Sequence, residues 1–489
     1  MNPLVALILC TGLVAMLLRF ERKRNPTASL ALWVPTLWMI LNGSKPIVRW
    51  FEPANVASVV SWEEGSSLDR LVLIILIVLA LLILSRRKIE WSWIIRDNRW
   101  LIILYLYLGF SILWSDFPFV SIKRWVRLIG SIPIAMVVMS ERSPLQALES
   151  VFRRCAYVLI PISLLLIKYF QHLGVAYVPW SGEKMWVGVT SQKNGLGVLC
   201  ALSAFLIIWT FYREWRAGAL FRIKSQALAD GLVFAIALFL LNGFKGAYSA
   251  TAIGFLIVGT ASLLFLYRMK IYVRQMATFL ILMVALGLLF LFFADSLVPI
   301  ATDIFHRDAT FTGRTDIWRL VLEVASRNPM LGVGYGGYWG LQDGMIYSTV
   351  GVREAHNGYL EVYLDAGMVG LALFFAFLLA HYLKALRKLN DAHDWGLFGI
   401  CFLMMTLMHN FSESNFLRTS SYFWNSTVFL TVVFSARNRQ SVECPAYASD
   451  SALTPDKQVG YRAGFAAEMV FFRVLLWRCL PKVLTVGGK

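Results

Sequence analysis

Long apolar runs alternate with short polar segments along most of the chain. A helix needs about 20 apolar residues to cross the hydrocarbon core of a bilayer, and thirteen runs reach or approach that length. They lie at 3–18, 28–42, 68–84, 99–115, 124–140, 155–170, 195–212, 229–242, 250–267, 276–293, 358–383, 395–410 and 420–436. The pattern predicts an all-α fold, a polytopic transmembrane helical bundle of about 12–13 spans.

Composition supports this class and excludes others. With 58% hydrophobic residues and a mean hydropathy of +0.63, the chain is too apolar for a soluble fold of its size. Six cysteines are scattered without CxxC spacing, so neither a disulfide framework nor a zinc site is expected. The net charge of +17 is spread over short loops rather than one patch. Membrane lipids are therefore the expected anionic partner, and nucleic acid is not.

Lysines and arginines gather in alternate loops, one of which is expected to carry Arg142, Arg153 and Arg154. The positive-inside rule assigns these loops to the cytoplasm. This predicts a multi-pass membrane protein with its amino terminus outside and its carboxyl tail inside. Residues 294–357 then form a large periplasmic loop containing short helices. That loop carries five arginines of its own, an exception to the rule, so these cations need another reason to lie outside.

The chain is expected to divide into three parts. Residues 1–98 form N-terminal transmembrane helices, 99–436 form a transmembrane core with the periplasmic loop, and 437–489 form a cytoplasmic tail. The first apolar run precedes a basic cluster, the reverse of a secretory signal, and should stay in the membrane. In the tail, Arg473 lies within the apolar stretch 465–480 and would cost about 2.5–3.5 kcal/mol at the centre of a span. An interfacial helix is therefore favoured there.

The periplasmic loop holds a candidate anion site at Arg314. Residues Thr315 to Ser326 have apolar side chains at helical spacing and stop before Asn328-Pro329, which predicts a short surface helix. Arg314 would lie at its amino end, where unpaired N–H groups and the helix dipole add to the positive charge. Such a corner suits a phosphate, although an arginine that only contacts lipid phosphates fits equally well.

His356 and Asn357 open the next membrane helix. A helix dipole favours the neutral imidazole, which could accept a proton near pH 7, and Glu361 about one turn on could orient the ring. A histidine that merely caps a helix at the interface is the alternative, but Arg314 in the same loop favours catalysis. The glycine-rich run 332–337 is expected to let the backbone approach a ligand closely, although it lacks the context of a nucleotide-binding fingerprint.

Other polar insertions are predicted on the same side of the membrane. One enters a span with Lys193-Asn194, one runs from His409 to Asn415, and one is a tight turn at Lys245. Taken singly, each is more often a helix cap. Together they are what a pocket at the membrane face would need.

These motifs resemble the bacterial O-antigen ligase and exopolysaccharide polymerase superfamily over roughly residues 100–435. The motifs that carry the resemblance are Thr312-Gly313-Arg314-Thr315-Asp316-Ile317-Trp318, Asn328-Pro329, Gly332-Val333-Gly334-Tyr335-Gly336, His356-Asn357-Gly358-Tyr359-Leu360-Glu361, Gly367 and Gly370. The segments Leu113-Trp114-Ser115-Asp116-Phe117-Pro118 with Ser121 to Arg124, Gln192-Lys193-Asn194-Gly195-Leu196-Gly197, and Glu413-Ser414-Asn415 are similar to the polymerase branch.

The resemblance implies a glycosyltransferase of the bacterial cytoplasmic (inner) membrane, with its active-site loop on the periplasmic side, that needs neither a metal nor a cofactor. It would transfer a glycan from undecaprenyl diphosphate to a sugar hydroxyl of a glycan or lipid-linked acceptor, alongside other polysaccharide assembly proteins. His356 matches the family's essential histidine, the base, with Glu361 beside it, and Arg314 matches the arginine that holds the diphosphate.

Further substrate-binding residues are expected around these two. They are Arg124, Lys193, Asn194, Lys245 and Asn357. Where many members have Ser-Arg-Gly-Ala, this chain aligns as Phe244-Lys245-Gly246-Ala247, so a lysine would replace a family arginine; alternatively Ser249-Ala250-Thr251 is the match. Lysine offers a point charge rather than a bidentate fork.

Two other functions compete with the enzyme. A transporter or flippase of the same lipid-linked glycan would be expected to show paired charges at mid-membrane and repeat symmetry, whereas the charges here are expected to cluster at one outer face. A non-catalytic assembly partner would tolerate loss of His356. The Trp114-Ser115-Asp116 resemblance favours a polymerase over a ligase.

Overall fold

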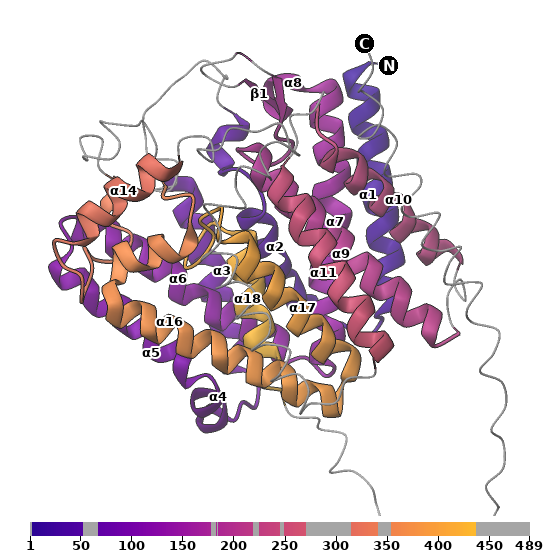
Figure 1. Cartoon of the computed structure of the whole chain (residues 1–489). Coiled ribbons are helices and arrows are strands. Elements are labelled where there is room, and N and C mark those ends of the chain that lie inside the picture. Colours follow the sequence, from indigo (N-terminus) through magenta and orange to yellow (C-terminus); the bar gives the residue numbers. More distant parts are fainter. Residues whose placement is uncertain are drawn as a thin grey trace, which may run out of the picture. The chain divides into compact units, whose positions relative to one another are not determined.

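The computed structural model describes residues 2–51, 67–177, 182, 184–218, 224–244, 249–269, 314–340 and 354–436. Residues 1–436 form one compact unit (Figure 1). The predicted apolar run 276–293, the turn at Lys245 and the tail from residue 437 lie outside the described residues. The interfacial helix and the three-part division of the chain therefore stay predictions.

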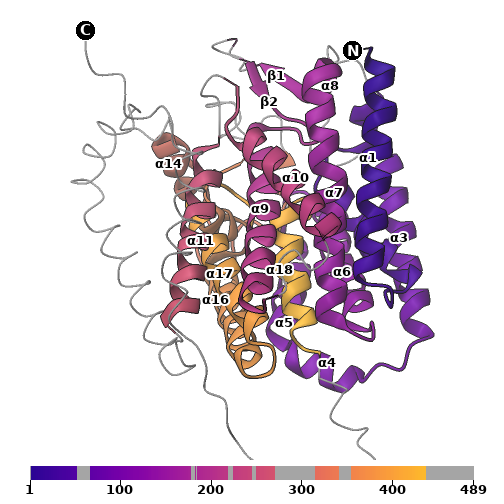
Figure 2. The same cartoon turned by 90° about the vertical axis from the view of Figure 1, so that its right-hand side faces the viewer.

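Helices dominate the described residues, which confirms the all-α helical bundle. They are α1 (Pro3–Arg24), α2 (Trp33–Asn42), α3 (Ser67–Ser85), α4 (Trp91–Asp97), α5 (Arg99–Phe110), α6 (Pro118–Met139), α7 (Pro144–Tyr169), α8 (Gln171–Gly174), α9 (Lys193–Arg216), α10 (Lys224–Leu241), α11 (Ala250–Met269), α14 (Arg314–Ala325), α16 (Gly358–Asp391), α17 (His393–His409) and α18 (Tyr422–Val433). A short antiparallel hairpin of β1 (Val175–Tyr177) and β2 (Lys184–Trp186), which the periodicity did not predict, lies at the same end of the bundle as α14 (Figures 1 and 2).

Six of the described helices are long and apolar enough to cross a membrane: α1, α3, α7, α9, α11 and α16. Shorter apolar helices cover Leu30–Asn42, Arg99–Trp114 and Ser225–Leu241. Apart from 276–293, every predicted apolar run falls on a helix. The chain is a multi-pass membrane protein, while a total of 12–13 spans stays a prediction.

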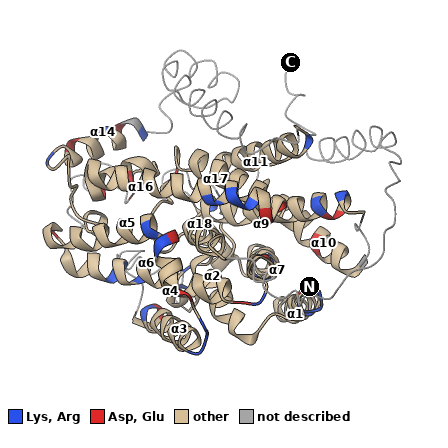
Figure 3. Cartoon of the chain, turned by 90° about the horizontal axis from the view of Figure 1, so that it is seen from below, with Lys and Arg blue, Asp and Glu red and all other residues tan. Residues whose placement is uncertain are grey.

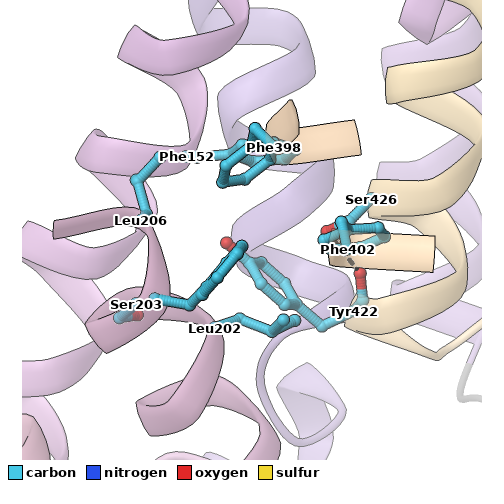
Figure 4. Close-up of a pocket in the computed structure, with 9 residues that line it drawn as sticks. Phe152, Leu202, Ser203, Leu206, Phe398, Phe402, Tyr422 and Ser426 are labelled. Carbon is cyan, nitrogen blue, oxygen red and sulfur yellow. Dashed lines mark hydrogen bonds between the residues drawn. The ribbon is translucent and has the colours of Figure 1, made fainter. Parts of the chain in front are cut away.

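Burial separates central helices from peripheral ones. In α7 and α9, 83% of the most apolar 18-residue window is buried inside the protein, against 11% in α1. The exposed leucines and isoleucines of α1 and α3 therefore face outward, where lipid would cover them. A cavity of about 20 Å³ lies between α7, α9, α17 and α18 and is lined mostly by apolar side chains such as Phe152, Leu206 and Phe402 (Figure 4). It has room for little more than one water molecule and cannot hold a sugar.

A cluster of ion pairs, not expected from the sequence, joins α1, α7, α9 and α10. Arg153 and Arg154 were predicted in a loop, but both lie inside α7 and are buried. Arg153 pairs with Asp230 and with Glu149, and Arg154 pairs with Glu21. Charges are therefore not confined to one outer face. Removing one partner of such a buried pair would leave an uncompensated charge, so separating the paired helices is unfavourable.

Lys and Arg on several helices are visible from the end of the bundle at which α4 lies (Figure 3).

Helix α16 is broken at Gly367, where φ is +62°. The break receives the glycine-rich segment: the amides of Val333 and Gly334 donate to Leu364 and Asp365, and the amide of Met368 donates to Pro329. At Gly332, φ is +73° and a Cβ atom would lie 2.5 Å from the backbone of Ala366. Gly332 thus permits a close approach to α16, and Cβ atoms at Gly334 and Gly336 would meet Ser115 and Arg124. These glycines allow the run to pack against other parts of the chain, whereas from the sequence we expected a close approach to a ligand.

Replacing Gly367 with alanine is expected to destabilise the fold. The left-handed conformation costs about 1–3 kcal/mol for a non-glycine residue, and the new Cβ would lie 2.4 Å from the backbone of Met330. The melting temperature of the detergent-solubilised protein should fall. Gly231→Ala is the matched control, because no atom lies within 4 Å of a Cβ there and alanine favours a helix. Equal melting temperatures for the two variants would contradict this account.

Candidate active site

Helix α14 packs against the first turns of α16 and thereby sets the position of Arg314. Its buried residues Ile317, Val321 and Val324 form a small apolar cluster with Trp339 and Leu364, separate from the main core. The indole of Trp318 also donates to the carbonyl of Ala355, 3.0 Å away. The helix begins at Arg314 and ends within a residue of the predicted range. The arginine at its amino end is therefore held beside the start of α16.

Arg314 and His356 meet at one carboxylate, that of Glu413. Nη2 of Arg314 lies 3.1 Å from Oε1 of Glu413, and Nδ1 of His356 lies 3.8 Å from Oε2. Arg314 also donates to the carbonyl of Ser412. A second carboxylate, Glu354, lies 3.1 Å from Nδ1 of the same imidazole. The two residues that the sequence singled out thus belong to one cluster.

The turn between α17 and α18 presents Glu413 to this cluster. The side chain of Asn410 accepts from the amides of Asn415 and Phe416, which fixes the turn. The amide of Gly358 donates to the carbonyls of Asn410 and Glu413, so the turn is attached to the first residue of α16. A Cβ atom at Gly358 would lie 2.3 Å from Oδ1 of Asn410. This close approach explains why a glycine follows Asn357.

The charges around His356 favour its protonated form. Burial alone would lower the pKa of His356, but Glu413 and Glu354 outweigh it and raise the pKa above the ordinary value. Burial would raise the pKa of Glu413, yet its interactions with His356 and Arg314 lower it. The sequence led us to expect a dipole-driven shift toward the neutral ring, and that expectation is wrong in direction. The two carboxylates prevail because both lie within 4 Å of the ring.

Activity should therefore depend on pH through His356. A base must be neutral, so a raised pKa places the acidic limb of kcat/KM above the ordinary histidine value of 6.5. Glu354→Gln removes one cause of the shift and should move that limb to lower pH. Glu323→Gln, at an exposed position of α14, is the control. An acidic limb that stays in place in the Glu354 variant would count against the role of His356.

Glu361 has a different place from the one expected. Its Oε2 accepts from the amide of Ala355, 3.0 Å away, and its Oε1 lies 3.3 Å from Nη2 of Arg418. Arg418 also pairs with Glu354. The carboxylates beside the imidazole are those of Glu354 and Glu413, not that of Glu361. Glu361 supports the loop that carries His356 instead of orienting the ring directly.

Among the remaining predicted residues, one joins the cluster and the others have different surroundings or lie outside the described residues. Asn194 joins it, because its side chain donates to Glu413 at 2.7 Å. Lys193, which precedes Asn194, is the first residue of α9. Asn357 caps α16 by accepting from the amides of Tyr359 and Leu360, which favours the helix-cap interpretation for this residue. Arg124 is buried and donates to the carbonyl of Gly336. Lys245 lies outside the described residues.

A polar cavity of about 160 Å³ adjoins the cluster. Its walls come from the end of α2, the start of α9, and the turn between α17 and α18. Glu354, Glu413 and Arg418 line it together with hydroxyl and amide side chains. Polar insertions from separate segments of the chain thus converge here, as a ligand pocket would need.

Glu354, His356 and Glu413 could also hold a metal ion, since their ligand atoms lie within 4.8 Å of one another. Each glutamate is already paired with an arginine, Glu354 with Arg418 and Glu413 with Arg314. A divalent cation would have to compete with two guanidinium groups, which disfavours it electrostatically.

Three functional candidates were missed in the sequence: Glu354, Glu413 and Arg418. Glu413 was noticed only as part of a motif, and Glu354 lies two residues before His356. Arg418 lies five residues after Glu413, and this closeness of a cation to the Glu413 motif was the signal in the sequence that could have identified it. Their positions depend on contacts between residues far apart in the sequence. Arg418 and Glu361 are 57 residues apart, and Arg314 and Glu413 are 99 residues apart. Spacing along the chain does not reveal such contacts.

Residues 231–375, which include Arg314 and His356, match the family model described as O-antigen ligase. This match supports the resemblance of the chain to the O-antigen ligase and exopolysaccharide polymerase superfamily. The chain is also 24% identical over 317 residues to the exopolysaccharide production protein ExoQ of Rhizobium meliloti (strain 1021), covering 62% of this chain and 69% of that protein. Both matches support a membrane protein similar to polysaccharide polymerases and ligases.

Proposed function

We propose that the protein polymerises a surface polysaccharide by transferring a glycan from undecaprenyl diphosphate to a sugar hydroxyl at the outer face of the cytoplasmic membrane. In this reaction the bond between the anomeric carbon and the phosphate oxygen breaks, and a new bond forms between that carbon and the acceptor oxygen. Undecaprenyl diphosphate leaves, and the acceptor proton passes to His356. The convergence of Arg314 and His356 on Glu413 carries the proposal.

The donor already carries a good leaving group. The protein must therefore mainly hold the diphosphate, orient the two substrates and deprotonate the acceptor hydroxyl. Arg314 lies at the start of α14, where its guanidinium and the N–H groups of the first turn favour an anion. A diphosphate arriving there would compete with Glu413 for the guanidinium. His356 would take the proton, and Glu354 and Glu413 would stabilise the imidazolium that forms.

Two observations favour a polymerase over a ligase. The similar protein from Rhizobium meliloti is named for exopolysaccharide production. The Trp114-Ser115-Asp116 segment also resembles the polymerase branch of the superfamily. Analysis of the glycans that accumulate in a deletion strain tests the choice. Single lipid-linked repeat units are expected, whereas finished lipid-linked chains would point to a ligase, and an unchanged glycan profile would refute both.

Activity is expected to survive removal of divalent metals, because arginine side chains already neutralise the carboxylates at the site. Transfer by the purified protein should proceed at an unchanged rate after treatment with EDTA. As a control, the rate should also stay unchanged when Mg²⁺ or Mn²⁺ is added back. Loss of activity with EDTA and recovery with one metal would assign Glu354, His356 and Glu413 to a metal site instead.

A further inference from the structure

The polar cavity beside the cluster is poorly suited to a diphosphate. Its charged lining residues are Glu354, Glu413 and Arg418, so carboxylates outnumber guanidinium groups, and Arg314 is not among the residues that line it. The rest of the wall is rich in hydroxyl and amide groups, including Thr190, Ser421 and Asn415. Such groups can both donate and accept hydrogen bonds. The lining therefore suits an uncharged molecule with many hydroxyl groups.

His409 lines the same cavity and has no hydrogen-bond partner for either ring nitrogen within the described part of the chain. The side chain is buried, with 1% of its surface exposed. Its ring stacks on Phe423 with centroids 5.5 Å apart and meets the edge of Phe255 at 5.0 Å, so packing fixes the plane of the ring. A buried imidazole without partners is unfavourable. A ligand hydroxyl could satisfy either nitrogen, because it donates as well as accepts.

The position of the cavity relates it to the proposed chemistry. Glu354 and Glu413 line it and are also the carboxylates beside His356, and Asn194 joins Glu413 from the same wall. A sugar in the cavity would thus contact the two carboxylates that flank the proposed base, while neither His356 nor Arg314 lines the cavity itself. The cavity therefore offers the uncharged nucleophile a place beside these carboxylates, apart from the guanidinium that we propose holds the charged donor.

We propose that this cavity binds the terminal sugar of the acceptor glycan and that His409 is a specificity-determining residue that hydrogen-bonds one of its hydroxyl groups. The inference rests on the proposed transfer reaction, in which that sugar supplies the attacking hydroxyl.

His409→Phe tests the inference, because phenylalanine preserves the aromatic packing against Phe255 and Phe423 and removes both nitrogens. With the purified full-length protein, the KM for the acceptor should rise at least tenfold. The KM for the lipid-linked donor and the kcat at saturating acceptor should stay unchanged, and so should the melting temperature. His409→Gln, which keeps a donor and an acceptor, should recover part of the acceptor affinity.

His381→Phe is the matched control. His381 is also buried, but it pairs with Thr431 in the core and does not line the cavity. Its replacement should leave the acceptor KM unchanged. An acceptor KM that is unchanged in His409→Phe, or a donor KM that rises equally, would overturn the subsite.

A binding measurement without turnover separates this inference from the proposed function. The probe is the set of oligosaccharides released by mild acid from the producing strain's own polysaccharide, and binding is followed by calorimetry. Weaker binding to His409→Phe than to the wild type supports the subsite, even if no variant transfers glycan and the proposed function fails. Equal binding to both proteins, with transfer by the wild type intact, overturns the subsite and leaves the function standing.

Discussion

Replacement of His356 by alanine is expected to stop polymer formation while the protein still inserts and accumulates normally. Loss of a general base typically costs 10²–10⁴-fold in rate. The imidazole lies within 4 Å of two carboxylates that would stabilise its protonated form, and alanine offers no proton acceptor in its place. The measurement is the kcat of glycan transfer by the purified variant, together with polymer length in a strain that carries only this variant.

The backbone at His356 calls for a second variant. Its φ is +49°, a conformation that asparagine tolerates better than most residues. His356→Asn should keep the local fold and remain as inactive as the alanine variant. His393→Ala, which changes an exposed histidine at the start of α17, should behave as the wild type. Polymer of normal length from either variant at position 356 would exclude its role as the base.

The sequence predicted the helices well because their determinants are local. An apolar run of about 20 residues has few alternatives to a membrane helix. The spacing of Ile317, Val321 and Val324 predicts α14 without reference to any other segment. Arg314 and His356 were identified because each lies at the amino end of a helix, a position that the sequence reveals.

The partners of these residues could not be predicted because they come from distant segments. Glu413 reaches Arg314 only because the amide of Gly358 binds the turn that carries the glutamate, and Gly358 itself follows His356 and Asn357. The glycine-rich run was misinterpreted for a related reason. Gly332 permits a close approach, but whether the approaching group is a ligand or the backbone at Gly367 depends on the tertiary fold. Arg153 was assigned to a loop because its compensating Asp230 lies 77 residues away in another helix.

Arg314→Lys is expected to lower kcat/KM for the lipid-linked donor by about 10- to 100-fold, although the charge is kept. The guanidinium uses Nη1 for the carbonyl of Ser412 and Nη2 for Glu413, so both nitrogens have fixed directions. An ammonium group is a compact point charge and cannot match this fork. Loss of one charge-assisted hydrogen bond costs about 1.5–3 kcal/mol, which corresponds to that range of rates.

Arg319→Lys provides the control for the Arg314 variant, because Arg319 is an exposed arginine of the same helix α14. It should leave kcat/KM unchanged, so that a loss confined to position 314 reports on geometry and not on the net charge of the loop. The donor KM should account for most of the loss if the guanidinium holds the diphosphate before the reaction. An equal loss in kcat would mean that the contact strengthens in the transition state. Wild-type transfer by Arg314→Lys would show that the diphosphate is held elsewhere, and the proposed division between a donor site at Arg314 and an acceptor site at His409 would fail with it.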